Sequence, residues 1–320
     1  MNESPGRKAA LICGSVAYDT ILVFPDRFRT HILPDKLHIL NVAFLVPEMR
    51  REFGGCAANI AYGLQLLGDT GVAMATAGDD FGPYRERMIA GGLEVAHVRV
   101  VAGTFTAQAF ITTDIEHNQI TAFHPGAMQQ AHLNAVAEAA NSARMPPIGL
   151  GIVAPDGRQA MIEHAAQFAA AGIPFIFDPG QGLPMFDGAE LLQFIAQATW
   201  LTLNDYEWEL MQQKTGLDAG QIVGQVDALI VTRGAEGSRI FTKGRTYEIP
   251  AAKPQRVIDP TGCGDAYRAG LIHGLLRGYD WERTGRVGAL MGALKIESRG
   301  PQNYRFTASD FQSRYQASFG

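Results

Sequence analysis

Short apolar runs alternate with amphipathic stretches along most of the chain. Residues 9–13, 72–75, 149–154, 174–177, 200–203 and 228–232 form apolar runs of the length expected for buried strands. Between such runs, apolar residues recur at helical spacing, as Ala57, Ile60, Ala61 and Leu64 do. This alternation is typical of βαβ units. It predicts an α/β fold of three layers, with a mainly parallel central sheet flanked by helices on both faces.

Two segments, 16–50 and 95–125, break this rhythm. The first holds the apolar run 38–46 with no predicted helix, and the second holds the runs 107–113 and 119–123 around a polar turn. They predict antiparallel strands and a hairpin, which we expect to form a small β-sheet that acts as a lid. The alternative is an edge extension of the main sheet. We expect one domain over residues 1–320 that includes both segments, and helices at 263–277, 281–298 and 307–315.

Composition narrows the function classes. Hydrophobic residues make up 47% of the chain and charged residues 18%, which predicts a folded globular protein. The net charge of −5 disfavours a nucleic-acid partner, and no apolar run is long enough to span a membrane. The run 9–13 is too short for the core of a signal peptide. Cys13, Cys56 and Cys263 show no zinc or disulfide spacing. We therefore expect a cytoplasmic protein without membrane or nucleic-acid partners.

The stretch 259–267, Asp-Pro-Thr-Gly-Cys-Gly-Asp-Ala-Tyr, gives the strongest indication of a reactive site in the sequence. It follows a strand-like run at 256–258 and opens an apolar helix. Gly262 and Gly264 allow a tight turn in which the N–H groups of residues 262–264 converge on an anion. Asp265 is then placed to take a proton from a hydroxyl group while the amides hold a phosphoryl group. The alternative is that its carboxylate merely caps the helix.

This stretch resembles the C-terminal signature of the ribokinase (PfkB) family of small-molecule kinases, Asp-Thr-Gly-Ala-Gly-Asp, with Cys263 in place of the alanine. Four more segments resemble motifs of that family in the same order along the chain: 14–19, 54–59, 204–207 and 232–237. The resemblance covers nearly the whole chain and implies a ribokinase-like fold. The sequence has no P-loop and no complete dinucleotide fingerprint, which disfavours an NAD-dependent oxidoreductase.

The resemblance also implies roles for individual residues. Asp265 is the expected general base, with the anion hole at Gly262, Cys263 and Gly264. The expected sugar-binding residues are Asp19, Gly54, Gly55 and Asn59. The expected ATP-binding residues are Asn204, Glu207, Thr232, Gly234, Gly237 and Thr261.

Two cations are implied as well. Glu207 is expected to contact Mg²⁺ through water, because magnesium keeps much of its hydration shell. K⁺ is expected near Asp259, among backbone oxygens around Thr261, Ser298 and Gly300. For Arg268, one turn beyond Asp265, we weigh a phosphate contact against a surface salt bridge.

The segments 265–270 and 178–181 resemble the prokaryotic nucleoside-kinase branch of the family, which includes adenosine kinases. This implies transfer of the γ-phosphate of ATP to the 5′-hydroxyl of adenosine or of a broader range of purine nucleosides. Phe44, Phe105, Phe110 and Phe123 are candidates for an apolar base slot, with Gln108 as a hydrogen-bonding group. The alternatives are a sugar kinase of the same family, similar to ribokinase or fructokinase, and a non-catalytic nucleoside-binding regulator. Monomer and homodimer both remain open.

Overall fold

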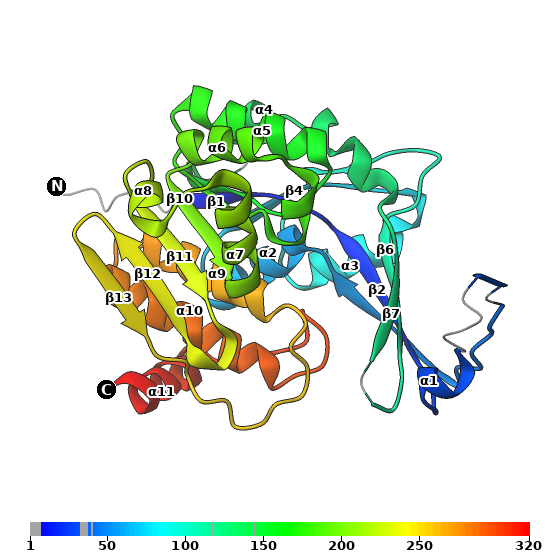
Figure 1. Cartoon of the computed structure of the whole chain (residues 1–320). Coiled ribbons are helices and arrows are strands. Elements are labelled where there is room, and N and C mark those ends of the chain that lie inside the picture. The colour runs from blue at the N-terminus through cyan, green and yellow to red at the C-terminus, as the bar shows by residue number, and fades with distance from the viewer. Residues whose placement is uncertain (1–7, 33–37, 40, 117, 144) are drawn as a thin grey trace.

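The central sheet has the predicted parallel core. The computed structural model describes residues 8–32, 38, 39, 41–116, 118–143 and 145–320. Within these residues, nine strands form one sheet in the order β13-β12-β11-β10-β9-β8-β1-β4-β5 (Figure 1). The strands are β1 (Ala9–Cys13), β4 (Gly71–Ala77), β5 (Val98–Val100), β8 (Ile148–Val153), β9 (Phe175–Phe177), β10 (Trp200–Asn204), β11 (Ala228–Thr232), β12 (Ser238–Thr242) and β13 (Arg245–Ile249). The pairs β11–β12 and β12–β13 are antiparallel, and the other neighbours pair in parallel.

All six apolar runs predicted as buried strands are strands of this sheet. The strand expected at 256–258 is wrong: the segment has no regular structure, and Val257 is 72% exposed. None of the described strands pairs with this segment, so the apolar pattern alone was insufficient. The antiparallel pair β12 and β13 was not predicted.

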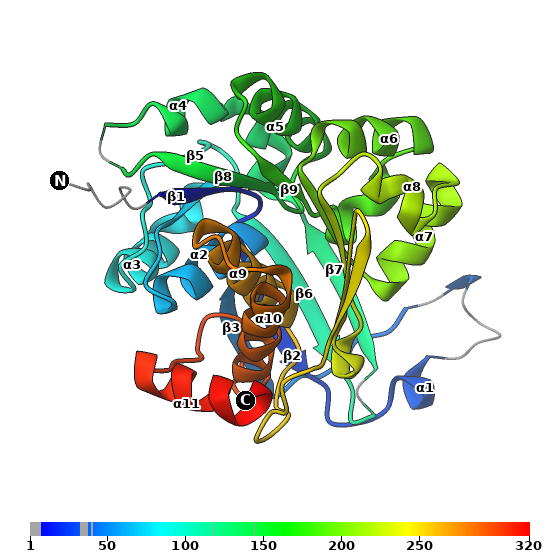
Figure 2. The ribbon, with the colours of Figure 1, turned by 90° about the vertical axis from the view of Figure 1, so that its left-hand side faces the viewer.

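Helices cover both faces of the sheet (Figure 2). Alternate residues of β1 supply the two cores: Ala10 and Ile12 pack with α2, α9 and α10, whereas Leu11 and Cys13 pack on the side of α5, α6 and α7. The helices are α1 (Phe28–His31), α2 (Cys56–Leu66), α3 (Gly82–Ala90), α4 (Val136–Ala140), α5 (Arg158–Ala171), α6 (Gly188–Gln197), α7 (Asp205–Thr215), α8 (Ala219–Val223), α9 (Cys263–Leu276), α10 (Trp281–Ile296) and α11 (Ala308–Phe319). The three predicted C-terminal helices are confirmed, and the last extends beyond its predicted end at residue 315.

A second, smaller sheet projects from the main body (Figure 1). Its order is β3-β2-β6-β7, with β2 (Ala17–Val23), β3 (Glu48–Gly54), β6 (Ala107–Thr113) and β7 (Gln119–His124). The predicted hairpin is confirmed as β6 and β7. The alternative of an edge extension is not observed, because these strands pair apart from the main sheet. Strands β2 and β6 run parallel, which differs from the purely antiparallel arrangement that we expected.

Two details of the predicted lid segments are wrong. The run 38–46 forms no strand where it is described (Leu40 lies outside the described residues), and Leu45 is 84% exposed. Instead, β2 pairs with β3, which comes after this run in the chain. Strand β5, within 95–125, pairs with β4 in the main sheet.

Across the described part of the chain, no helix is both long and apolar enough to cross a membrane.

Candidate active site

Two helices, α2 and α9, begin at the same place in the fold, and a glycine precedes each of them. Gly55 (φ 90°) and Gly262 (φ 81°) adopt a backbone conformation that other residues rarely tolerate. A Cβ atom on Gly55 would lie 2.5 Å from the Ser15 carbonyl oxygen, and one on Gly262 would lie 2.6 Å from Cβ of Pro301. The two predicted glycine motifs therefore make close backbone contacts where these helices start.

The two helices then approach each other closely at Gly63. A Cβ atom there would lie 2.6 Å from Cβ of Ala269, so the absence of a side chain at Gly63 permits the contact. One helical turn nearer to both N-termini, Asn59 Nδ2 donates a hydrogen bond of 2.8 Å to Asp265 Oδ2. The glycine in α2 thus supports the contact that orients the predicted base.

The N-terminus of α9 offers free N–H donors beside Asp265. Among the described residues, no acceptor is found for the N–H groups of Gly262 and Gly264. The N–H of Cys263 differs, because it donates to the Pro260 carbonyl oxygen at 3.1 Å. The prediction that all three amides converge is therefore wrong for Cys263. The two free donors and the helix dipole still favour an anion here.

Burial shapes the acidity of the two carboxyl groups of the site. Burial raises the pKa of Asp265 to about 6, although the Asn59 hydrogen bond and the charge of Arg268 oppose this rise. Burial also raises the pKa of Asp19 to about 6, and the charges of Asp265 and Glu52 add to the effect. Both carboxyl groups are mainly ionised at neutral pH, and Asp265 is more basic than an ordinary aspartate. Such a group is suited to accept a hydroxyl proton.

A buried network that the sequence analysis missed holds Asn59 in place. Gln302 Nε2 donates to Asn59 Oδ1 at 2.9 Å and to the Tyr84 hydroxyl oxygen at 2.6 Å, and the Tyr84 hydroxyl donates to the Gly54 carbonyl oxygen at 2.6 Å. Gln302 is 243 residues from Asn59 along the chain, so no local pattern could have revealed the contact. The network fixes the orientation of the Asn59 amide that faces Asp265.

Asp19 enters the same site from β2. A Cβ atom on Gly54 would lie 2.5 Å from Asp19 Oδ2, so the glycine leaves room for the carboxylate. The structure therefore brings together Asp19, Gly54, Gly55, Asn59 and Asp265, as the motifs predict.

The expected nucleotide-binding residues lie at the carboxyl ends of neighbouring strands. Asn204 ends β10 and pairs in register with Thr232, which ends β11. Gly234 and Gly237 follow in the next turn, with φ angles of 53° and 88°. Ligands of open parallel sheets bind at this edge. Thr261 is exposed in the loop before α9, where its N–H donates to Asp259 Oδ1 at 2.9 Å.

Both carboxylate oxygens of Glu207 accept hydrogen bonds within the protein, which restricts how this residue can contact Mg²⁺. One carboxylate oxygen accepts from the Asn204 backbone N–H at 2.8 Å and the other from Asn204 Nδ2 at 2.7 Å, in the capping box that begins α7. Burial raises the pKa of Glu207. The described residues contain no group of three or more acidic, His or Cys side chains placed to hold a metal ion. The remaining lone pairs of Glu207 fit contact with a hydrated ion.

Arg268 forms a buried ion pair, and the surface salt bridge weighed above is wrong. Its Nε and Nη2 atoms bind the two carboxylate oxygens of Asp178 at 2.9 Å each, and both residues are buried. Asp178 directly follows β9, so the pair connects α9 to the strand edge that carries the nucleotide motifs. Its charges also reach Asp265 and Glu207.

Comparison with known proteins agrees with this arrangement. Residues 21–307 match the pfkB family of carbohydrate kinases. The chain belongs to the pfkB family. It is therefore a phosphotransferase that acts on an alcohol group.

Its relatives include several nucleoside kinases. The chain is 34% identical to a nucleoside kinase of Methanocaldococcus jannaschii over 266 residues, which are 82% of this chain and 85% of that protein. It is 52% identical to the Burkholderia thailandensis nucleoside kinase in complex with inosine, with a TM-score of 0.87 over 97% of this chain and 98% of that one. The B. thailandensis enzyme is also known in complex with ADP-inosine, at 54% identity and a TM-score of 0.84 over 97% and 96% of the two chains.

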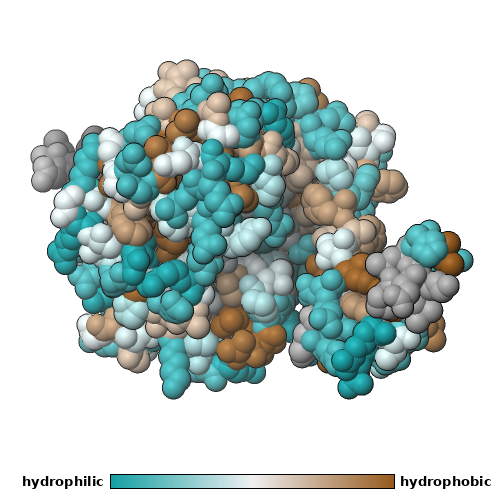
Figure 3. Space-filling view, in the orientation of Figure 1, coloured by the Kyte–Doolittle hydropathy of each residue, from teal (hydrophilic) through white to brown (hydrophobic). Residues whose placement is uncertain are grey.

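The register of the small sheet separates the residues predicted for the base slot, because Phe123 shares a face with Asp19 and Phe110 does not. Glu52, Asp19, Ala109 and Phe123 are register partners across β3, β2, β6 and β7, so their side chains share one face. In the space-filling view, the surface is hollowed between the main body and this sheet (Figure 3).

Gln108 and Phe110 alternate with Ala109 and therefore lie on the opposite face of the small sheet. Gln108 Nε2 donates to Asp80 Oδ2 at 3.1 Å, behind the sheet. Their predicted contact with the nucleobase is thus not supported. The sequence could not show this, because the register between strands decides which residues share the face of Asp19. Phe44 also lies outside the row of residues around Asp19. The centroid of its ring lies 4.8 Å from that of Phe24 and 5.1 Å from that of Phe28.

The kinase also contains a buried lysine that the motifs did not reveal. Lys295 is fully buried near the end of α10, and its Nζ donates to the backbone carbonyl oxygens of Asp259 at 2.7 Å and Ser298 at 3.2 Å. These are two of the positions where we expected K⁺.

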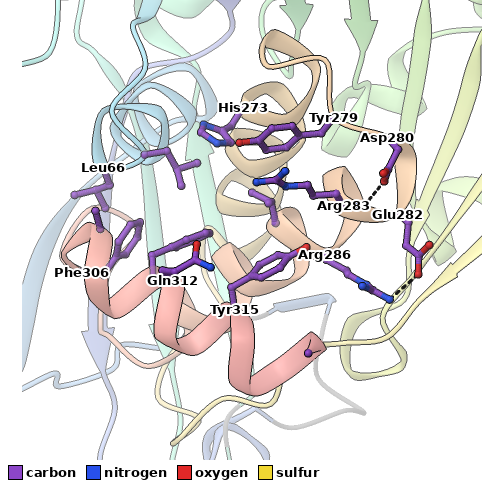
Figure 4. Close-up of a pocket in the computed structure, with 15 residues that line it drawn as sticks. Leu66, His273, Tyr279, Asp280, Glu282, Arg283, Arg286, Phe306, Gln312 and Tyr315 are labelled. Carbon is purple, nitrogen blue, oxygen red and sulfur yellow. Dashed lines mark hydrogen bonds and ion pairs between the residues drawn. The ribbon is translucent and has the colours of Figure 1, made fainter.

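A separate pocket lies between α9, α10 and α11 (Figure 4). His273, Arg283 and Tyr315 contribute to its lining. His273 is eight residues beyond Asp265, or more than two turns along α9. This pocket is therefore distinct from the site that contains Asp265.

Proposed function

We propose that this kinase transfers the γ-phosphoryl group of ATP to the 5′-hydroxyl of a nucleoside, within a purine range that includes inosine and adenosine. One observation carries the proposal: Asp265, held by Asn59, lies beside the free N–H groups at the start of α9. A general base next to an anion site is what transfer from a triphosphate to an alcohol requires. The similarity to a kinase solved with inosine supports a nucleoside as the acceptor.

In the proposed reaction, Asp265 accepts the proton of the 5′-hydroxyl as that oxygen attacks the γ-phosphorus and the bond to the β-phosphate oxygen breaks. The N–H groups of Gly262 and Gly264 stabilise the charge on the transferred group. Asp19 and the second N–H of the Asn59 amide hold the ribose hydroxyls. Gly54 and Gly55 let the sugar approach the backbone.

The nucleotide occupies the strand edge at Asn204, Thr232, Gly234 and Gly237, and its phosphates reach Thr261 and the start of α9. Mg²⁺, when bound to the phosphates, would neutralise part of their charge. Glu207 would contact its water shell.

The spacing across the small sheet suits a nucleoside. Asp19 and Phe123 are two strand positions apart on one face, which corresponds to roughly 10 Å. Ala109 between them has a small side chain, and Phe123 is 52% exposed. A ribose bound to Asp19 would therefore place its base within reach of the Phe123 ring, where stacking accepts different purines.

A substrate panel tests the proposal. ADP release is measured with inosine, guanosine, adenosine, cytidine, free ribose and fructose, and the product is identified by phosphorus NMR. We expect a purine nucleoside to have the highest kcat/KM and to yield the 5′-phosphate. Better turnover of ribose or fructose would favour a sugar kinase. Nucleoside binding without ADP release would favour a non-catalytic regulator.

A further inference from the structure

The ammonium group of Lys295 lies directly beneath the loop that leads into α9. A Cβ atom on Gly262 would lie 3.8 Å from Lys295 Cε, on the side where Pro301 packs. The ammonium joins two separate segments, because one acceptor, the Asp259 carbonyl, precedes α9 and the other, the Ser298 carbonyl, follows α10.

The charge of Asp259 also contributes to this arrangement. Its carboxylate oxygens accept the backbone N–H groups of Thr261 at 2.9 Å and Gly300 at 2.8 Å. Burial raises the pKa of Asp259, but these N–H groups and the charge of Lys295 outweigh burial and lower it. The buried ammonium thus donates to two carbonyl oxygens and feels the charge of the nearby Asp259 carboxylate, which together offset its loss of hydration.

A helix-capping role alone does not account for this lysine. Lysines in the last turn of a helix interact favourably with its carbonyl groups, usually from an exposed position. Lys295 is 0% exposed, and its shorter hydrogen bond reaches a residue 36 positions away, in the loop that carries the proposed anion hole. The group therefore supplies a fixed positive charge to that loop.

The residues present do not fit an additional potassium ion. A potassium ion would need the same carbonyl oxygens that already accept from Lys295, and the ammonium would repel a second cation at such short range. We propose that the ammonium of Lys295 takes the place of a monovalent metal ion beneath residues 259–264, so that phosphoryl transfer by this kinase is independent of potassium. This inference rests on the proposed function for its activity readout.

Lys295 acts as a positioning residue in this arrangement, since it touches the loop and not the reacting atoms. It holds the Asp259 and Ser298 carbonyls together and raises the electrostatic potential at the N–H groups of Gly262 and Gly264. The expected consequence of its removal is an empty space between carbonyl oxygens that a potassium ion can occupy.

The test compares wild-type protein, Lys295→Ala and Lys295→Met in potassium, sodium and tetramethylammonium chloride at equal ionic strength. Lys243→Ala, at an exposed lysine in the β12–β13 turn, is the matched control. We expect wild type and the control to have the same kcat in all three salts. Lys295→Ala should lose at least about tenfold in kcat in tetramethylammonium and recover in potassium. Lys295→Met, whose side chain fills the space, should lose activity without recovery.

Thermal unfolding in the same salts gives a second readout that needs no acceptor substrate. Potassium should raise the Tm of Lys295→Ala relative to tetramethylammonium and leave wild type unchanged. If no acceptor is phosphorylated, the proposed function fails, and this comparison still decides the role of Lys295. Stimulation of wild type by potassium would overturn the inference. So would full activity of Lys295→Ala in tetramethylammonium, or a folded Lys295→Ala that potassium neither activates nor stabilises. If Lys295→Ala does not fold, the wild-type salt comparison decides.

Discussion

The helix junction at α2 and α9 and the small sheet contribute to the same site but are built differently. At the junction, Gly63 and the Gln302 network fix Asn59 against Asp265 in a buried setting. In the small sheet, every residue of β7 is exposed, and Phe123 faces the site from this outer strand. In the proposed function, packed helices hold the reacting groups, whereas acceptor selection falls to a sheet whose outer strand is exposed.

The largest effect is expected from Asp265→Asn. The change removes the proposed base and keeps an oxygen acceptor for Asn59, so kcat should fall by roughly 10²–10⁴ with modest change in nucleoside affinity. Steady-state kinetics with inosine and calorimetric binding would measure both quantities.

A stability measurement separates this loss from misfolding. The pKa of Asp265 in the fold is about 6, above its ordinary value, so its ionisation at neutral pH opposes folding. Asp265→Asn should therefore unfold with a free energy up to roughly 3 kcal/mol higher at pH 7, and this gain should shrink as pH falls below about 6 and be mostly lost by about pH 4, near the ordinary pKa of an aspartate. A folded, stabilised variant with near-normal turnover would exclude Asp265 as the base.

The next effect tests the helix junction itself. In Gly63→Ala the new Cβ must push against Ala269, which separates the helices near Asn59 and Asp265. We expect a loss of about tenfold to a hundredfold in kcat, because small displacements of reacting groups are costly. Gly82→Ala, whose Cβ would meet nothing within 4 Å, is the matched control. Unchanged kcat in Gly63→Ala would show that this contact does not position the base.

A smaller effect, confined to binding, is expected from the small sheet. Phe123→Ala should raise the KM for inosine by about tenfold with little change in kcat, since base stacking on an aromatic ring is lost. Phe110→Ala is its counterpart on the opposite face and should leave KM unchanged. Equal effects of the two substitutions, or the reverse order, would contradict the assignment of faces.

The smallest effect is a shift in pH dependence. The rate of the wild-type reaction, as kcat/KM, should fall as pH decreases through about 6, where Asp265 and Asp19 become protonated. Asp19→Asn removes a neighbouring negative charge and should move the midpoint to lower pH. A profile that is flat between pH 5 and pH 8, a range of roughly one unit or more on either side of that pKa, would contradict a base with raised pKa.

The sequence predicted the junction better than the small sheet, for a physical reason. The glycines before α2 and α9, and the side chains of Asp19, Asn59 and Asp265, lie in short motifs whose geometry is local. The six buried strands were also predictable, because burial on both faces leaves continuous apolar runs. Whether Phe110 or Phe123 faces Asp19 depends on register between strands far apart in the chain. Gln302 and Lys295 act through contacts across 243 and 36 residues, which no local pattern encodes.

The central claim is that Asp265 meets the acceptor hydroxyl at the start of α9. A crystal structure with inosine and a non-hydrolysable ATP analogue tests it most directly. We predict that a carboxylate oxygen of Asp265 lies within hydrogen-bond distance, about 2.6–3.2 Å, of the inosine 5′-oxygen, with the ribose 2′- and 3′-hydroxyls at Asp19 and Asn59. A complex in which the 5′-hydroxyl points away from Asp265, and another carboxylate contacts it, would contradict the account.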